Sequence, residues 1–139
     1  MKTNIATDSS QSQRLLRCGV SADTADMARY EDDEVPMMPW DWTTGSYGGT
    51  FPAWSLNALL GLLPKEIDID GYKYRISIYF ESSDEPVIGN QWCLYYKPKK
   101  HNEKSHYIDD VPMYATDLIE CAVLMIEWLI RHNYKLNKQ

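Results

Sequence analysis

The sequence predicts an α+β domain, in which an antiparallel β-meander of three or four strands packs against a C-terminal helix. Three observations support this fold class. Asp70-Gly71 stands between two alternating segments and is typical of a β-hairpin turn. Residues 91–97 alternate again and predict a third strand, and residues 118–130 predict a long apolar helix.

The 139 residues are enough for one domain, which we divide into three regions. Residues 1–29 are expected to form helical N-terminal elements. Residues 30–50 are acidic and aromatic, contain prolines and glycines, and predict an irregular segment. Residues 51–139 are expected to form an α-β-β-β-α core.

The hairpin prediction includes a register, because a two-residue type I′ turn at Asp70-Gly71 fixes which residues face each other. In that register, apolar residues share one face and opposite charges share the other. A shift by one residue would destroy both patterns. The predicted pairs are Ile69–Tyr72 and Ile67–Tyr74 on the apolar face, and Asp68–Lys73 and Glu66–Arg75 on the charged face.

The N-terminal region carries signals for both ends of a helix over residues 9–18. Asp8 and Gln11 have the spacing of a capping box, in which each side chain binds a backbone N–H of the other residue. Gly19 suits the left-handed position that ends a helix, and Val20 would complete a Schellman motif.

Two further helices follow from apolar periodicity. Four leucines at i, i+3, i+4 and i+7 predict a helix within residues 52–63, with Pro52 in its first turn or Ser55 as its N-cap. The last helix begins near Asp117 and is apolar around most of its circumference, so we expect cover on several sides. The N-terminal helices or a second copy of the chain would supply that cover, which leaves a homodimer open. Residues 106–108 are the candidate fourth strand.

Composition predicts the cellular compartment of the protein and the class of partner it binds. The formal charge of −6 disfavours non-specific binding to phosphate backbones. Three cysteines without CxxC spacing are typical of reduced thiols in a cytoplasmic protein. The N-terminus lacks an apolar signal core, and no apolar run reaches the ~20 residues of a membrane span. A membrane is therefore not an expected partner.

No pattern typical of catalysis, a metal site or a cofactor site stands out. Residues 66–71 resemble the start of a calcium loop, but Ser77 stands where a bidentate glutamate is required. The glycines of residues 45–49 lack the lysine of a phosphate-binding loop. Cys93 and His106 would have to meet in space to make a thiol and its base. We therefore expect no metal and no cofactor.

A candidate protein-binding surface begins in the irregular segment. An acidic run at residues 31–34 precedes several Met and Trp residues, and these side chains favour interfaces. The alternative is that the aromatic side chains pack at the rim of a small core. The candidate residues for partner binding are Met37, Met38, Trp40, Trp42, Tyr47 and Trp54.

A second candidate surface is basic. Lys97, Lys99 and Lys100 follow the third strand beside Tyr95. Lysines next to aromatic side chains on a sheet bind single-stranded nucleic acid through phosphate contacts and base stacking. The alternative is a solvated loop whose charges protect an edge strand, and the net acidic charge favours that alternative.

Several short motifs together resemble a family of small uncharacterised proteins from phages, prophages and mobile elements of Bacteroides-type bacteria. The resemblance covers most of the chain and weakens in residues 81–112. It implies no catalytic residue and no cofactor, and it implies a cytosolic protein that acts on host or phage macromolecules. The motifs are Gln11–Val20, Thr24–Met27, Pro52–Leu56, Leu59-Leu60 with Leu63-Pro64, and Glu127–Leu129 with Tyr134.

The sequence thus favours a non-enzymatic protein-interaction module encoded by a phage or mobile element. A nucleic-acid-binding protein that uses the lysine and tyrosine patch is the first alternative. A small enzyme of unspecified reaction is the second.

Overall fold

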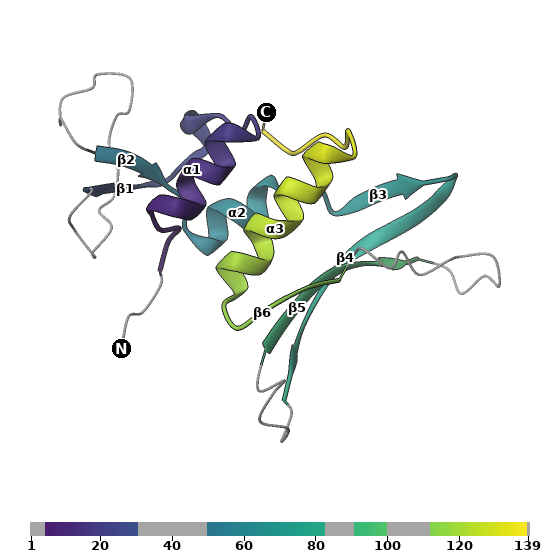
Figure 1. Cartoon of the computed structure of the whole chain (residues 1–139). Helices are drawn as coiled ribbons and strands as arrows, with labels where there is room; N and C mark the ends of the chain where they lie inside the picture. Colours follow the sequence, from purple (N-terminus) through teal and green to yellow (C-terminus); the bar gives the residue numbers. More distant parts are fainter. Residues whose placement is uncertain (1–4, 31–49, 83–90, 100–111, 139) are drawn as a thin grey trace.

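The computed structural model describes residues 5–30, 50–82, 91–99 and 112–138 of the chain (Figure 1). Two antiparallel sheets and three α-helices confirm the α+β class, with the C-terminal helix packed on the larger sheet. The elements in chain order are α1 (Ser9–Arg17), a 3₁₀ turn (Ala22–Thr24), β1 (Met27–Tyr30), β2 (Thr50–Ala53), α2 (Leu56–Leu62), β3 (Glu66–Ile69), β4 (Tyr72–Glu81), β5 (Gln91–Pro98), β6 (Pro112–Ala115) and α3 (Leu118–Arg131).

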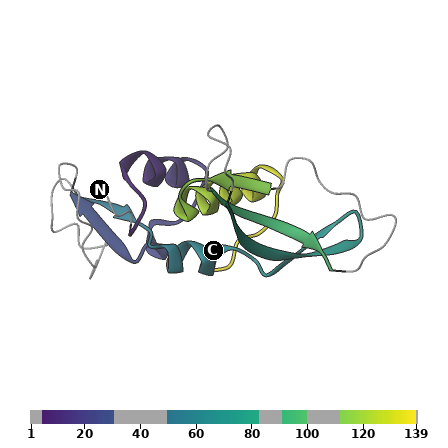
Figure 2. The ribbon, with the colours of Figure 1, turned by 90° about the horizontal axis from the view of Figure 1, so that it is seen from below.

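The larger sheet has the strand order β3-β4-β5-β6, and all its neighbours are antiparallel. Figure 1 shows the helices on one side of this sheet, and Figure 2 shows the β1–β2 pair at the opposite end of the molecule from it. Helix α3 contacts β5 and β6 as well as α1 and α2. The expectation that α3 is covered on several sides is therefore confirmed.

The hairpin between β3 and β4 has the predicted register at every pair, from Ile69 opposite Tyr72 to Glu66 opposite Arg75. Asp70 and Gly71 have φ angles of 53° and 85°, as a type I′ turn requires. The Gly71 N–H also donates to the Asp68 carboxylate at 3.0 Å. A glycine at the second turn position avoids the strain that a side chain would meet at positive φ.

Helix α1 begins and ends as its sequence predicts. The Asp8 carboxylate accepts the Gln11 N–H at 2.8 Å, and the Gln11 amide oxygen accepts the Asp8 N–H at 3.0 Å. At the other end, Gly19 has φ 105° and the Val20 N–H donates to the Leu15 carbonyl at 3.0 Å. Both the capping box and the Schellman motif are confirmed.

Residues near the first sheet correct two expectations. The last three residues of the region expected to be helical, residues 27–29, belong instead to strand β1, which pairs with Thr50–Ala53 in β2. Pro52 therefore lies in a strand rather than in the first turn of a helix. Pro52 pairs with Ala28, and β1 and β2 are the two strands described in this sheet, so both are edge strands there. Edge strands tolerate proline.

Helix α2 starts at the alternative cap, Ser55, whose hydroxyl accepts the Ala58 N–H at 3.1 Å. Asp26 holds Ser55 in place, because its carboxylate accepts the Ser55 N–H at 2.8 Å and also the Ser55 hydroxyl. This contact joins residues far apart in sequence, so periodicity alone could not place the start of the helix.

The fourth strand of the larger sheet is β6, which pairs with Trp92–Tyr95 of β5. The candidate fourth strand at residues 106–108 lies outside the described residues. Strand β5 lies inside the sheet, between β4 and β6, and Pro98 is its last residue.

The core lies between α3, α2, α1 and the sheet face that carries Leu94 and Tyr96. Arg14 of α1 ties that helix to α3 through ion pairs with Glu120, at 2.5 Å, and Glu127. These two carboxylates are the polar interruptions in the apolar run of α3. Their position explains how a largely apolar helix carries two charges without burying them unpaired.

Candidate functional site

One face of the larger sheet points away from α3, and we call it the outer face. Side chains alternate between the two faces of a strand. Leu94 and Tyr96 belong to the core cluster and Ile76 packs against it, so their neighbours along each strand point to the opposite face. The outer face therefore carries Arg75, Ser77 and Tyr79 of β4, Cys93, Tyr95 and Lys97 of β5, and Tyr114 of β6.

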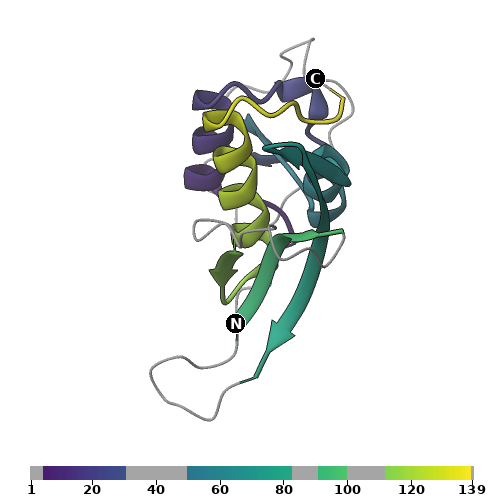
Figure 3. The ribbon, with the colours of Figure 1, turned by 90° about the vertical axis from the view of Figure 1, so that its right-hand side faces the viewer.

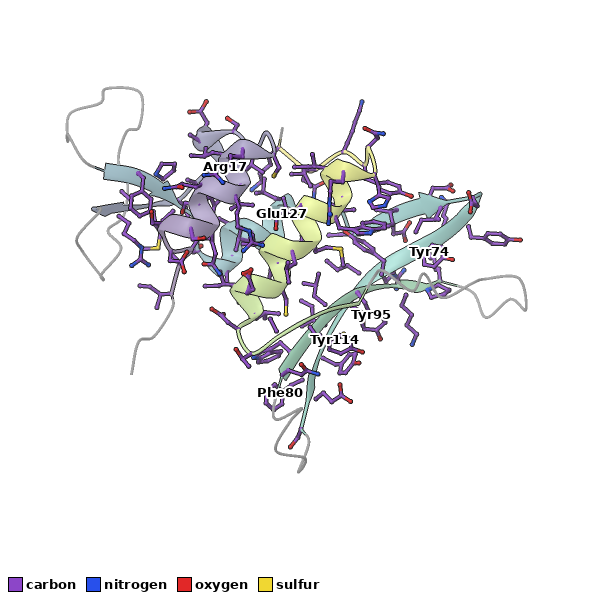
Figure 4. All side chains as sticks on the ribbon, in the orientation of Figure 1. Arg17, Tyr74, Phe80, Tyr95, Tyr114 and Glu127 are labelled. Carbon is purple, nitrogen blue, oxygen red and sulfur yellow. The ribbon has the colours of Figure 1, made fainter. Side chains whose placement is uncertain are left out.

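Three tyrosines form a cluster on this face. Cys93 is in register with Tyr79 on one side and with Tyr114 on the other. The hydroxyls of these two tyrosines lie 3.3 Å apart. The Tyr79 ring meets the Tyr95 ring edge-to-face, with centroids 5.5 Å apart. Figure 4 shows Tyr95 and Tyr114 on the side of the sheet away from the helices.

Two tyrosines of the cluster are exposed to solvent and are also held by hydrogen bonds. Tyr79 and Tyr114 keep 40% and 43% of their surface exposed, whereas Cys93 beside them is fully buried. The hydrogen bond to Tyr114, and a second to Cys93, raise the pKa of Tyr79 far above its usual value. The Tyr79 phenol thus stays neutral at physiological pH and adds no negative charge to the surface.

A cationic pocket lies on the same two strands as this cluster. Its lining includes Arg75 and Ser77 of β4, and Lys97 and Lys99 at the end of β5. Arg75 faces Lys97 across the strands, and Ser77 faces Tyr95. Along the paired strands β4 and β5, the pocket is therefore adjacent to the tyrosine cluster.

The three cationic side chains of this pocket differ in how closely each is paired with a carboxylate. Lys99 donates to the Glu66 carboxylate at 2.9 Å, and this contact lowers the pKa of Glu66. Arg75 stands 3.7 Å from the same carboxylate, and Lys97 forms no ion pair with any described residue. Lys97 and Arg75 are thus the cations best placed to receive an external anion.

The structure brings Tyr95, Lys97 and Lys99, predicted from the sequence, onto this surface. Lys100 lies outside the described residues. Sequence reasoning missed Tyr79, Tyr114 and Arg75 because the β4–β5 and β5–β6 registers are set across long connections. Alternation along residues 72–80 was a usable signal for Arg75 and Tyr79, since it already placed them together on one face.

Trp54 corrects the predicted protein-binding surface. Its side chain is fully buried in the core, and its indole N–H donates to the Thr24 hydroxyl at 2.9 Å. Trp54 therefore packs inside the described fold and is not part of its exposed surface. The other candidates, Met37, Met38, Trp40, Trp42 and Tyr47, lie outside the described residues.

The thiols lead to a first prediction. Burial raises the pKa of Cys121 to about 11, and Cys93 is also buried. A thiol is nucleophilic only as the thiolate, so at mildly alkaline pH Cys121 should resist Ellman's reagent in the native protein. Cys93 should resist it as well, because the reagent cannot reach a fully buried thiol. The half-buried Cys18 should react first, and denaturant should expose all three thiols. Rapid native labelling of Cys93, identified by peptide mapping, would contradict this and support a thiol enzyme; its candidate base, His106, lies outside the described residues.

Across the described parts of the chain, no cluster of three His, Cys, Asp or Glu residues could hold a metal ion. No helix within those same parts has the length and apolar character needed to cross a membrane.

No protein-family model, curated protein or solved structure matches this chain.

Proposed function

We propose that the outer face binds single-stranded nucleic acid. The observation that carries the proposal is the proximity of three tyrosines, two of them well exposed, to a cationic pocket on a sheet face that no described helix covers. Bases stack on aromatic rings in such surfaces while lysine and arginine contact the backbone phosphates. Tyr95 lies between the two parts and would stack a base next to a phosphate held by Lys97 and Arg75.

The geometry favours a single strand over a duplex. Stacking on Tyr79, Tyr95 or Tyr114 requires a base whose face is accessible, and bases in a duplex are already stacked. The formal charge of −6 also opposes long runs of phosphate contacts. The proposed site is accordingly short, with about two phosphate contacts and a binding slope of about −1.4 in log Kobs against log salt.

The first test measures fluorescence anisotropy with a short labelled oligothymidylate at low salt. Tyr95→Ala should weaken binding by about 1–3 kcal/mol, roughly 5- to 150-fold in Kd, because one stacked base is lost. Tyr95→Phe keeps the aromatic ring and should bind nearly as the unmodified chain does. Circular dichroism of each variant checks that the sheet is retained.

Lysine variants separate phosphate contact from general charge. Lys97→Ala should weaken binding and reduce the magnitude of the salt slope by about 0.7. Lys135→Ala is the matched control, because Lys135 is exposed, follows α3 and does not line the cationic pocket. Absence of binding at low salt, or equal losses for the two lysine variants, would refute the proposal.

A further inference from the structure

The far end of β4 has an open edge. Strand β3 pairs with β4 only as far as Arg75, whereas β5 pairs with β4 as far as Glu81. On the side away from β5, no described strand accompanies residues 77–81. Figure 3 shows this end of β4 at the border of the sheet.

The backbone of this edge can form further strand hydrogen bonds. The Ile76 N–H donates toward the β3 side, to the Lys65 carbonyl at 3.0 Å, whereas the Lys73 carbonyl accepts from Lys99 on the β5 side. Main-chain groups alternate between the two sides of a strand. Ile78 and Phe80 therefore direct their N–H and C=O groups to the open edge, where no described residue accepts or donates.

The side chains of the edge are apolar and exposed. Ile78, Tyr79 and Phe80 keep 38%, 40% and 49% of their surface exposed. They are consecutive, and Phe80 rests on Trp92 of the neighbouring strand with ring centroids 5.0 Å apart. An exposed apolar edge of this kind is a template for pairing with another strand, and proteins usually protect such an edge with charges or proline.

We propose that the occupant of this edge is a second copy of the chain, joined through antiparallel β4–β4 pairing about a two-fold axis at Tyr79. In this register Ile78 faces Phe80 of the second copy, and Tyr79 faces Tyr79 of the second copy. Ile78 and Phe80 then exchange N–H and C=O bonds in both directions, which uses the main-chain groups that these two residues direct to the open edge. The contact is the same on both chains and closes as a dimer.

Other registers fit less well. A two-fold axis at Ile78 would need the Ile76 N–H, which already donates to Lys65. An axis at Phe80 would place Tyr79 opposite Glu81 of the second copy. The axis at Tyr79 instead sets Glu81 diagonal to Arg75 of the second copy, and cross-strand diagonals are within reach of long, oppositely charged side chains. The edge is thus complementary to itself in its main-chain hydrogen-bonding groups and in charge.

Sedimentation equilibrium without nucleic acid tests the dimer. The unmodified chain should change from one to two 16.1 kDa subunits as its concentration rises from micromolar toward millimolar. Ile78→Lys should remain monomeric, because lysine on an edge strand opposes pairing. Leu16→Lys is the matched control: Leu16 is 39% exposed on α1, and this variant should still dimerise. Phe80→Lys repeats the test if Ile78→Lys unfolds, as judged by circular dichroism.

Disulfide formation tests the register. In a Cys18→Ala, Cys93→Ala background, Tyr79→Cys should form a disulfide-linked dimer on mild oxidation, because the two-fold axis places the two new thiols opposite each other. Ser77→Cys in the same background should not, because its partner position is Glu81. A chain that stays monomeric throughout the concentration series, or efficient linking of Ser77→Cys alone, would overturn the proposal.

Ile78 and Phe80 point to the opposite side of the sheet from the outer face, so failure of the dimer would leave the nucleic-acid test unaffected.

Discussion

Replacing Trp54 with alanine should lower the free energy of unfolding by about 3–5 kcal/mol, the usual cost of removing a large buried aromatic side chain. The indole is fully buried and bonds to Thr24. The backbone on either side is also fixed, because Thr7 accepts the Trp54 N–H at 3.0 Å and donates its own N–H to the Trp54 carbonyl at 2.9 Å. Loss of the ring would open a cavity where the N-terminal segment, the 3₁₀ turn and the start of α2 meet.

Urea denaturation followed by far-ultraviolet circular dichroism measures this loss. Trp54→Phe keeps most of the ring volume but removes the bond to Thr24, so it should lose less stability than the alanine variant. Trp92→Ala is a useful comparison, because Trp92 is only half-buried. A Trp54→Ala variant as stable as the unmodified chain would contradict a structural role and favour the partner-binding role first expected of this residue.

Leu129→Ala should destabilise the protein by about 2–5 kcal/mol. Leu129 is fully buried in the core cluster on α3. Its carbonyl also accepts the Tyr134 N–H at 2.9 Å, in the turn after the helix, where Asn133 has a φ of 64°. The alanine leaves the backbone bond intact, so the expected loss comes from the removed side-chain contacts and the cavity they leave.

Leu124→Ala is the matched control for this prediction. Leu124 lies on the same helix but is only partly buried and is not part of the core cluster. Truncation at this position should cost well under half of the Leu129 value, because little apolar surface is removed from the core. Equal losses for the two variants in the same denaturation assay would show that α3 is covered on that side too, for instance by a second chain.

The sequence by itself determined the local features of this protein. The cap of α1 depends on Asp8 and Gln11, three residues apart, and its end depends on Gly19 and Val20. The β3–β4 register depends on a two-residue turn, which leaves no freedom in how the strands align. In each case the interacting groups are close along the chain, so residue type and spacing fix the geometry.

Only the tertiary structure decided the features that depend on distant residues. Strand β1 exists because it pairs with β2, and helix α2 starts at Ser55 because Asp26 holds that residue. Tyr79, Tyr95 and Tyr114 share one surface through strand registers that the sequence leaves open. The physical reason is that long connections allow many registers, and the choice among them is made by how the core side chains fit together.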